Sequence, residues 1–284
     1  MAFKADFVLL VNCKSTIGIV AAIATCIANQ QGDIIENSQF DDATTGRFFM
    51  RVAIVGTHIT TESFAKSFTP VAERYDMDWK IFDTKVRQRA IIMVSQGGHC
   101  LNDLLYRTST GRLPMDVTSI ISNHTTWRRR AEHEGVPFYH LPITPENKEE
   151  QERTLLAMID EQQADLVILA RYMQVLSDKL CDRLNGQVIN IHHSFLPGFK
   201  GARPYHRAFE RGVKMVGATA HYVTSDLDEG PIITQDVTAV DHADTVDDLI
   251  ALGQDTESRV LARAVKLHIE HRVMRNGNRT VVFK

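Results

Sequence analysis

The residues best able to do chemistry lie together where an apolar segment ends. Asn190 and His192 are two positions apart, at the end of a run of valine and isoleucine and before a loop rich in glycine and proline. In an extended strand, residues two apart point to the same face, and His193 would point to the opposite face. An amide and an imidazole on one face can stabilise negative charge on a carbonyl oxygen. The spacing therefore predicts an oxyanion-stabilising pair at the end of a strand.

A second polar segment, residues 224–231, follows a predicted strand that carries His221. It contains two aspartates, Asp226 and Asp228, and ends in a Gly-Pro turn. An aspartate beside an imidazole can orient water or accept a proton. The same composition is also that of a solvated loop, and a lone histidine such as His221 is more often a hydrogen-bonded core residue.

The histidines also raise the question of a metal site. His192, His193, His206 and His221, together with Asp228, offer enough imidazole and carboxylate groups to bind a divalent metal. Their spacing, however, forms neither an HExxH motif nor an HxH pair with a spaced carboxylate. We therefore predict no metal site, and purely structural roles for these side chains stay open as an alternative.

Composition limits the class of protein. The chain has 284 residues, 44% of them hydrophobic and 24% charged, and a net charge of −3, so no basic field attracts nucleic acid. Its first apolar stretch, residues 7–11, is too short for a signal peptide, and no segment reaches the roughly 20 apolar residues of a membrane span. Four isolated cysteines, Cys13, Cys26, Cys100 and Cys181, predict free thiols in a reducing compartment. We expect a cytoplasmic protein with no membrane or nucleic-acid partner.

The N-terminal part of the chain has the order strand, helix, strand, strand, helix, strand. A polar turn joins the second and third strands, and glycine follows the first helix. This order predicts a ferredoxin-like βαββαβ domain. The predicted strands are residues 7–11, 34–40, 48–55 and 78–82, and the predicted helices are residues 17–29 and 61–75.

The polar segment 83–89 separates this unit from the rest, which gives domains 1–84 and 85–284. In the second domain strands alternate with helices, which predicts an α/β fold with a doubly wound, mostly parallel, Rossmann-like sheet. Reactive groups in such a sheet gather at the carboxyl ends of the strands, where Asn190 lies. The predicted strands are residues 90–94, 115–121, 136–140, 166–169, 188–191, 217–224 and 232–240, and the predicted helices are residues 101–108, 127–134, 149–163, 177–184 and 245–272.

Four segments together resemble a known enzyme family. Residues 190–206 and 217–233 resemble the N-x-H strand end and the D-x-D-x-G loop of the folate-dependent formyltransferase fold. LARYMQVLS at 169–177 and TGRFFMRV at 45–52 resemble the formyltetrahydrofolate deformylase branch. The resemblance covers nearly the whole chain. It implies a hydrolase of one-carbon metabolism that converts 10-formyltetrahydrofolate to tetrahydrofolate and formate, a reaction connected with purine biosynthesis.

The resemblance also implies roles for individual residues. Asn190 and His192 would stabilise the oxyanion, and Asp228 would activate the water. His221 and His99 would support these catalytic residues without contacting the substrate themselves. No metal and no other cofactor is implied, because folate is the substrate. The residues implied to bind folate are Tyr172, Met173, Gln174, Val175, Leu176, Thr224 and Leu227.

The N-terminal unit looks like an ACT domain, a module that often binds amino acids between paired copies. The resemblance therefore implies a homo-oligomer and an amino-acid effector near Asn12, Gly18 and Ile19. The loop at residues 12–18 departs from the Pro-rich D-x-P-G-I form common after the first strand, although Gly18 is kept. This departure weakens the expectation of an effector.

Two other functions stay open. One is formyl transfer to an amine such as glycinamide ribonucleotide, in whose transferases a G-x-G-S/T-N loop cradles the substrate phosphate. The corresponding stretch here, residues 95–101, has Gln96, His99 and Cys100 at the changed positions and retains Gly98. The other is a folate-binding or amino-acid-sensing protein, which is disfavoured because all three presumed catalytic positions carry competent side chains.

Overall fold

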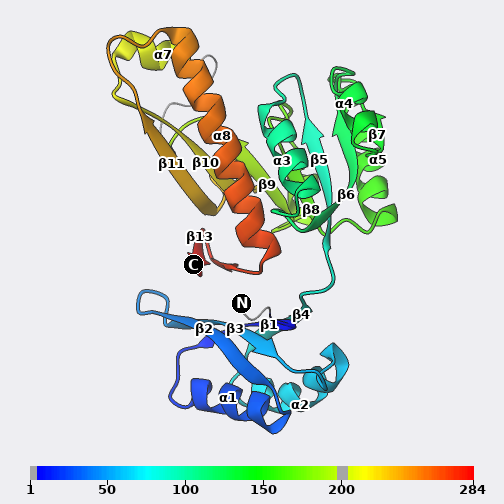
Figure 1. Cartoon of the computed structure of the whole chain (residues 1–284), viewed down its shortest axis with the longest axis vertical. Helices are drawn as coiled ribbons and strands as arrows, with labels where there is room; N and C mark the ends of the chain where they lie inside the picture. The colour runs from blue at the N-terminus through cyan, green and yellow to red at the C-terminus, as the bar shows by residue number, and fades with distance from the viewer. Residues whose placement is uncertain (1–4, 197–203) are drawn as a thin grey trace. The chain divides into compact units, whose positions relative to one another are not determined.

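The computed structural model describes residues 5–196 and 204–284, and its contacts divide the chain into two compact units (Figure 1). The first unit contains the described residues up to Arg87, together with two C-terminal segments, His271–Asn276 and Val281–Lys284. The second unit contains Gln88–Glu270 and Gly277–Thr280. Each unit has its own buried core, so each is described by itself.

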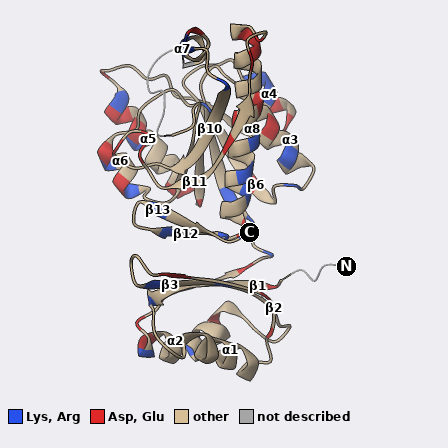
Figure 2. Ribbon diagram, turned by 90° about the vertical axis from the view of Figure 1, so that its left-hand side faces the viewer, with Lys and Arg blue, Asp and Glu red and all other residues tan. Residues whose placement is uncertain are grey.

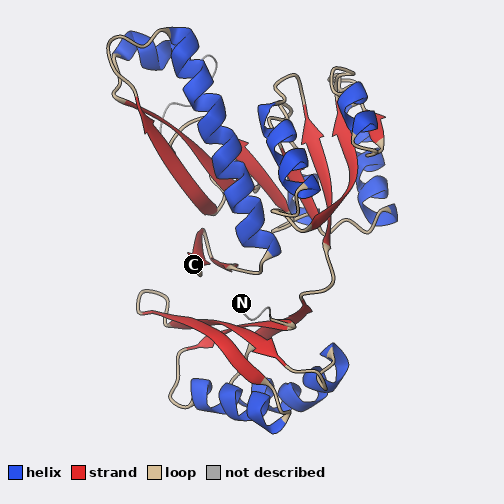
Figure 3. Ribbon diagram, viewed as in Figure 1, coloured by secondary structure: helices blue, strands red, loops and turns tan. Residues whose placement is uncertain are grey.

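The first unit is a four-stranded antiparallel sheet with two helices on one face (Figure 3). Its strand order is β2-β3-β1-β4, so the predicted βαββαβ arrangement is confirmed. The elements are β1 (Phe7–Lys14), α1 (Ile19–Asn29), β2 (Asp33–Asp42), β3 (Arg47–Val55), α2 (Thr61–Arg74) and β4 (Asp78–Asp83).

Sequence spacing explains why the two helices pack on the sheet. Ile19, Ile23 and Ile27 are four apart along α1, so they share one face, and all three are buried. In α2, Phe64 and Phe68 are likewise four apart, fully buried and stacked on each other. These side chains bury the apolar face of the sheet, which is the main stabilising contribution in a unit of this size.

The second unit is a seven-stranded sheet with the order β11-β10-β9-β8-β5-β6-β7. The five strands from β9 to β7 are parallel, and β10 and β11 are antiparallel to their neighbours. The strands are β5 (Gln88–Val94), β6 (Met115–Ser122), β7 (Phe138–His140), β8 (Leu166–Leu169), β9 (Val188–His192), β10 (Met215–Tyr222) and β11 (Ile232–Ala239). The helices are α3 (His99–Ser109), α4 (Arg128–His133), α5 (Lys148–Glu161), α6 (Asp178–Arg183), α7 (Pro204–Arg211) and α8 (Val246–Ile269).

The strand order places the loops that can carry a site. From β5 the chain builds β6 and β7 on one side and then returns to build β8 and β9 on the other. This reversal between β5 and β8 is the point where open α/β sheets bind their ligands, at the carboxyl ends of the strands. Charged residues lie mainly on the surrounding helices, and the strands are mostly uncharged (Figure 2).

The C-terminal end differs from the prediction. The last helix was expected to run to residue 272, but α8 ends at Ile269 and His271 has a left-handed φ of 52°. A hairpin follows, made of β12 (Val273–Asn276) and β13 (Arg279–Val282). Its turn contains Gly277 with a φ of 60° after an asparagine, and Asn-Gly is a strong hairpin signal that the helical interpretation overlooked.

Two expectations from composition concern the whole chain. The four cysteines are free, as predicted, and all four are buried. Within residues 5–196 and 204–284, no helix combines the length and the apolar character that crossing a membrane requires.

Candidate active site

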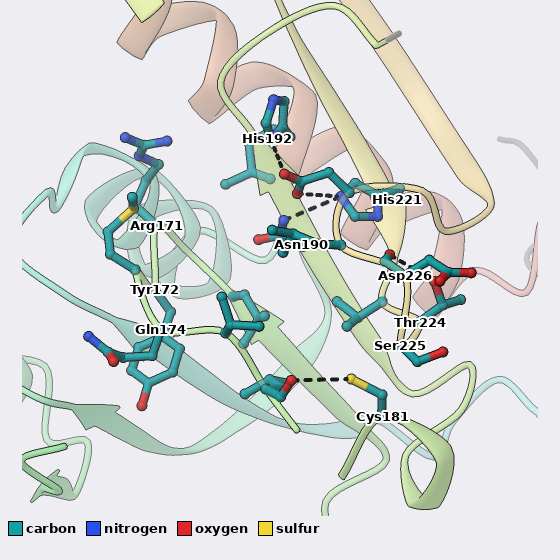
Figure 4. A pocket seen from close by; sticks show the side chains of 18 of the residues that line it. Arg171, Tyr172, Gln174, Cys181, Asn190, His192, His221, Thr224, Ser225 and Asp226 are labelled. Carbon is teal, nitrogen blue, oxygen red and sulfur yellow. Dashed lines mark hydrogen bonds and ion pairs between the residues drawn. The ribbon is translucent and has the colours of Figure 1, made fainter. Parts of the chain in front are cut away.

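The candidate site lies on two neighbouring antiparallel strands, β9 and β10. Their register pairs Asn190 with His221 and His192 with Thr219. Ile189 and Ile191 alternate with these polar residues and are buried, which fixes the face that the polar side chains occupy. Two polar residues of β9 and one of β10 therefore converge at one edge of the sheet (Figure 4).

His192 and Asp228 form an ion pair at this edge. Nδ1 of His192 lies 3.1 Å from Oδ2 of Asp228, and the His192 side chain is only 6% exposed. Burial raises the pKa of the Asp228 carboxyl, but the hydrogen bond from His192 and the nearby ring of His221 outweigh burial and lower it well below its usual range. Asp228 is therefore ionised and is a negatively charged partner for Nδ1 of His192.

Asn190 is oriented by His221. Nδ1 of His221 lies 2.9 Å from the carbonyl oxygen of Tyr222, and a carbonyl only accepts, so this nitrogen carries a proton. Nε2 of the same ring lies 3.3 Å from the Asn190 amide nitrogen and 3.7 Å from Oδ1 of Asp228, so the ring faces both groups. The amide carries two N–H donors, so an N–H of Asn190 is left to donate elsewhere.

His193 does not follow the alternation expected from the sequence. The strand β9 ends at His192, so the next residue is free of the strand geometry and does not turn to the opposite face. Instead the two imidazoles stack, with ring centroids 4.6 Å apart and an interplanar angle of 25°. Burial, followed by the charges of Arg171 and His192, lowers the pKa of His193 to about 4. His193 is therefore neutral at physiological pH.

A cavity of roughly 260 Å³ opens beside these groups. Figure 4 shows Arg171, Tyr172 and Gln174 on one side of it and Asn190, His192 and His221 on the other. All three predicted catalytic residues, all seven residues predicted to bind folate, and His221 line this cavity. They are Tyr172, Met173, Gln174, Val175, Leu176, Asn190, His192, His221, Thr224, Leu227 and Asp228.

The segment from Tyr172 to Leu176 has the mixed character expected of a surface that contacts a flat heterocycle. Met173 and Val175 are 60% and 55% exposed, whereas Tyr172 and Leu176 are buried. Backbone hydrogen bonding holds the segment, since Ser95 Oγ accepts from the Met173 N–H over 2.9 Å. The exposed apolar side chains are thus presented to the cavity by a segment that this bond and the burial of Tyr172 and Leu176 hold in place.

His99 lies outside this cavity. It lines a neighbouring cavity of roughly 320 Å³, which shares Arg171, Met173 and Gln174 with the first. Nε2 of His99 lies 2.7 Å from a carboxylate oxygen of Glu257. His99 therefore has no direct contact with the predicted catalytic residues.

Glu257 was not among the residues predicted from the sequence. It lies in the middle of α8, is 0% exposed, and contacts His99, Arg171 and Tyr205. The sequence carries one signal for Glu257. Gly253 and Thr256, which precede it on the same helix, are buried, so its carboxylate is on a face of α8 that otherwise packs inward. A glutamate on the buried side of a helix requires partners, and this requirement points to a polar cluster.

Of the cluster considered for a metal, His192, His193, His221 and Asp228 line the cavity, whereas His206 is exposed and does not line it. Within the described part of the chain, one group of three possible ligands lies close together, His99, Cys100 and Glu257. Burial raises the pKa of the Cys100 thiol, which keeps it protonated. Both oxygens of Glu257 already have hydrogen-bonding partners.

The residues predicted to bind an effector belong to the first unit. Asn12 accepts from Arg47 Nε over 2.9 Å and donates to Asp78 over 3.1 Å. Gly18 has a left-handed φ of 95°, and Ile19 is buried in the core of the unit. Only Asn12 and Gly18 of the three are thus available to a ligand at the surface.

Comparison with known proteins identifies the family. The model of the formyl transferase family matches residues 88–265. A formyltetrahydrofolate deformylase from Corynebacterium sp. (strain P-1) is 48% identical over 286 residues, which cover 100% of both chains. The chain belongs to the formyltetrahydrofolate deformylases. A solved deformylase structure from Burkholderia mallei agrees, with 49% identity, a TM-score of 0.95, and coverage of 99% of this chain and 100% of that one.

This chain also resembles a different class of enzyme over part of its length. A glycinamide ribonucleotide transformylase structure from Symbiobacterium toebii is 32% identical, with a TM-score of 0.65, and covers 70% of this chain and 95% of that chain. The likeness to the Burkholderia mallei deformylase, by contrast, extends over both units.

The loop at residues 95–101 contains a glycine whose role the structure explains. A Cβ at Gly98 would lie 2.0 Å from the ring of Trp127, so a side chain there is incompatible with the ring. The indole N–H of Trp127 donates to the carbonyl oxygen of Gln96 over 3.1 Å. Gly98 is therefore required by the packing of Trp127, and its presence needs no bound phosphate.

Proposed function

We propose that this chain hydrolyses 10-formyltetrahydrofolate to tetrahydrofolate and formate, as its family name states for its relatives. The observation that carries the proposal is the 3.1 Å contact between His192 and Asp228 in a cavity whose other side is formed by residues 172–176. A charged acid–base pair and an apolar surface for a flat ring are the two features that this reaction needs.

The substrate is held by its pterin ring along residues 172–176. Met173 and Val175 from one side and Leu227 from the other are more than half exposed around this cavity. Covering them with a flat heterocycle removes apolar surface from water, which contributes to binding. Backbone groups of the segment supply the polar contacts that orient the ring.

The oxyanion is stabilised by His192 and Asn190. With its Nδ1–H directed to Asp228, the protonated ring has an Nε2–H left, and this nitrogen is buried without a hydrogen-bond partner among the described residues. Nε2–H donates to the formyl oxygen as it becomes negative, and the second N–H of Asn190 adds a donor. Donors placed in a buried site stabilise developing charge more than they would in water.

Asp228 orients the attacking water and accepts its proton. The water oxygen bonds to the formyl carbon while the carboxylate takes the proton, which gives a tetrahedral intermediate. The carbon–N10 bond then breaks and the proton held by Asp228 is passed to N10, which gives tetrahydrofolate and formic acid; the acid loses its remaining proton to solvent and leaves as formate. No group besides water is consumed, and the side chains return to their initial protonation states.

The alternative is formyl transfer to the amine of glycinamide ribonucleotide, and two observations disfavour it. The ring of Trp127 packs against Gly98. His99, the first residue of α3, is hydrogen-bonded to Glu257 of α8. Two of the side-chain donors in the G-x-G-S/T-N loop are replaced here by His99 and Cys100, so the phosphate loses partners that such a loop supplies.

The test is product analysis of 10-formyltetrahydrofolate incubated with the protein, with and without glycinamide ribonucleotide. Formate is expected at the same rate in both, with no formylated nucleotide. Appreciable transfer to the amine would reject hydrolysis in favour of the alternative, and the absence of any turnover would support a binding protein.

The first unit is proposed to regulate the enzyme. A βαββαβ unit that resembles an ACT domain supports binding of an amino acid between paired copies, and hence a homo-oligomer. We place the enzyme in the cytoplasm, an assignment supported by four free thiols. The reaction as written requires no metal or other cofactor.

A further inference from the structure

A buried cluster lies behind the His192–His193 stack. At its centre is Glu257, whose Oε2 lies 2.7 Å from Nε2 of His99 and 3.3 Å from Nε of Arg171, and whose Oε1 accepts from the Tyr205 hydroxyl over 2.6 Å. Burial raises the pKa of Glu257, but these three partners outweigh it and lower the pKa, so the carboxylate is ionised. Leaving such a charge unpaired would be strongly destabilising.

Tyr205 reaches Glu257 because α8 has no side chain at Gly253. A Cβ there would lie 2.1 Å from the Tyr205 hydroxyl oxygen, so the ring lies directly against the helix backbone. Two residues of α8, one turn apart, thus serve the same purpose, since Gly253 admits the ring and Glu257 binds its hydroxyl.

Arg171 connects this cluster to the candidate catalytic residues. Its Nε contacts Glu257, and its Nη1 lies 3.0 Å from Nδ1 of His193. Its backbone has the left-handed φ of 64°, a strained conformation for a residue other than glycine. Such strain persists only where surrounding contacts hold the residue, and here the guanidinium is held at both ends.

The contact with Arg171 sets the tautomer of His193. A guanidinium only donates, so Nδ1 of His193 accepts and the proton of the neutral ring is on Nε2. The ring is thereby fixed in one orientation, stacked on His192. Because His192 is also bonded to Asp228, its imidazole is held between the carboxylate and the fixed ring.

We propose that Glu257 is a positioning residue for the reaction: it fixes Arg171, Arg171 fixes His193, and the His193 ring holds His192 against Asp228. The inference rests on the proposed function for its kinetic consequence only. The physical connection is a continuous series of contacts of 3.3 Å, 3.0 Å and one ring stack. A misplacement of about 1 Å in a catalytic group can cost on the order of 100-fold in rate.

The test uses Glu257→Gln and Arg171→Gly in the full chain. Glycine accepts the left-handed backbone at position 171, so this variant removes the side chain without adding strain. We expect kcat to fall about 10- to 100-fold in each variant, with KM changed less than about threefold in Glu257→Gln. Because both act through one series of contacts, the double variant should be no slower than the slower single variant.

Thr256→Val is the matched control. Thr256 is adjacent to Glu257 on α8, equally buried, and bonds to Thr238 over 2.8 Å on a different path. The control should lower the thermal midpoint and leave kcat unchanged. If Glu257→Gln behaves in the same way, with kcat unchanged, Glu257 has only a structural role and the proposal is overturned.

A spectroscopic readout separates this proposal from the proposed function. In the ¹⁵N spectrum of labelled histidines, with the His193 signal assigned from a His193→Gln variant, the wild type should show the Nε2–H tautomer. Arg171→Gly and Glu257→Gln should change the fraction of His193 in this tautomer, and Thr256→Val should leave that fraction unchanged. An unchanged tautomer in both test variants overturns the positioning role, and this measurement does not depend on turnover of any substrate.

Discussion

One oxygen of Asp228 lies 3.1 Å from Nδ1 of His192, and the backbone of Asp228 has the left-handed φ of 58°. The loop that carries the aspartate is closed at its base, where the Tyr222 N–H donates to the carbonyl oxygen of Pro231 over 3.0 Å. Gly230 permits this closure, since a Cβ there would lie 1.8 Å from the Tyr222 carbonyl oxygen. The carboxylate is therefore presented to the imidazole by a short loop with both ends fixed.

Replacing either member of this pair should abolish most of the activity. His192→Ala removes the oxyanion donor, and Asp228→Asn keeps the size and tolerates the left-handed backbone but loses the charge. We expect kcat to fall about 10²–10⁴-fold in each, the usual effect of losing such groups. Steady-state kinetics with 10-formyltetrahydrofolate, with thermal unfolding as a control for folding, checks this; a kcat near the wild-type value would refute the mechanism.

His193 should make the stability of the protein depend on pH. Its folded pKa is about 4, whereas an unfolded histidine has a pKa of about 6.5, so between these values the unfolded chain binds more protons. The free energy of unfolding therefore decreases as the pH falls through this range. His193→Gln should reduce the slope of the free energy of unfolding against pH by up to about 1.4 kcal/mol per pH unit. Urea unfolding from pH 4.5 to 7 measures it, and equal slopes for both proteins would count against a buried neutral His193.

Glu152 should support the folate-binding segment. It is 8% exposed, and its carboxylate accepts from the backbone N–H of Ser177 over 2.9 Å and from the Ser177 hydroxyl, just after residues 172–176. Glu152→Ala leaves these donors unpaired and should lower the free energy of unfolding by about 1–3 kcal/mol. We also expect a higher KM with a smaller change in kcat. Glu152→Gln, which keeps an acceptor, should be intermediate, and a lower kcat at constant KM would argue for another role.

Chelation should leave the activity unchanged. The chemistry assigned to His192 and Asp228 uses side chains and water alone. A metal at the group formed by His99, Cys100 and Glu257 would have to displace Arg171 and Tyr205 from the carboxylate. Rates before and after exhaustive dialysis against a chelator should agree. Loss of activity that is restored by one equivalent of zinc would instead assign the metal a role.

An amino-acid effector should act through Asn12. Its side chain accepts from Arg47 and donates to Asp78 at the start of the loop where the effector is predicted. At least one amino acid should raise the thermal midpoint of the full chain, because a ligand that binds only the folded state stabilises it. Asn12→Ala should lose the response. If none of the twenty amino acids changes the stability or the rate, the first unit is not a sensor of amino acids.

Much of the fold was predictable because periodicity reflects burial. The alternation of strands and helices after residue 88 predicted the doubly wound sheet, and the order of elements before it predicted the βαββαβ unit. The C-terminal hairpin was missed because residues 270–276 continue a charged helical pattern, and only Asn276 and Gly277 mark the turn. Local composition alone did not separate a frayed helix end from a short strand.

The site was predictable only in part. The spacing of Asn190 and His192 indicated a pair on one face, and the family resemblance supplied the role of Asp228. The contact of Asn190 with His221 depends on the register of β9 and β10, and that of Glu257 with Arg171 joins residues 86 positions apart. Such partners are determined by tertiary packing, and no short pattern in the sequence encodes them.

The pairing of β9 with β10 has a kinetic consequence. His192 ends the first of these strands, His221 belongs to the second, and Asp228 lies in the loop that follows, so one strand pairing assembles all of them. The chain between the two strands, residues 193–214, must close before any of these contacts forms, and such non-local pairing is slow. Recovery of activity during refolding therefore requires this pairing, and it should lag behind the return of helical signal.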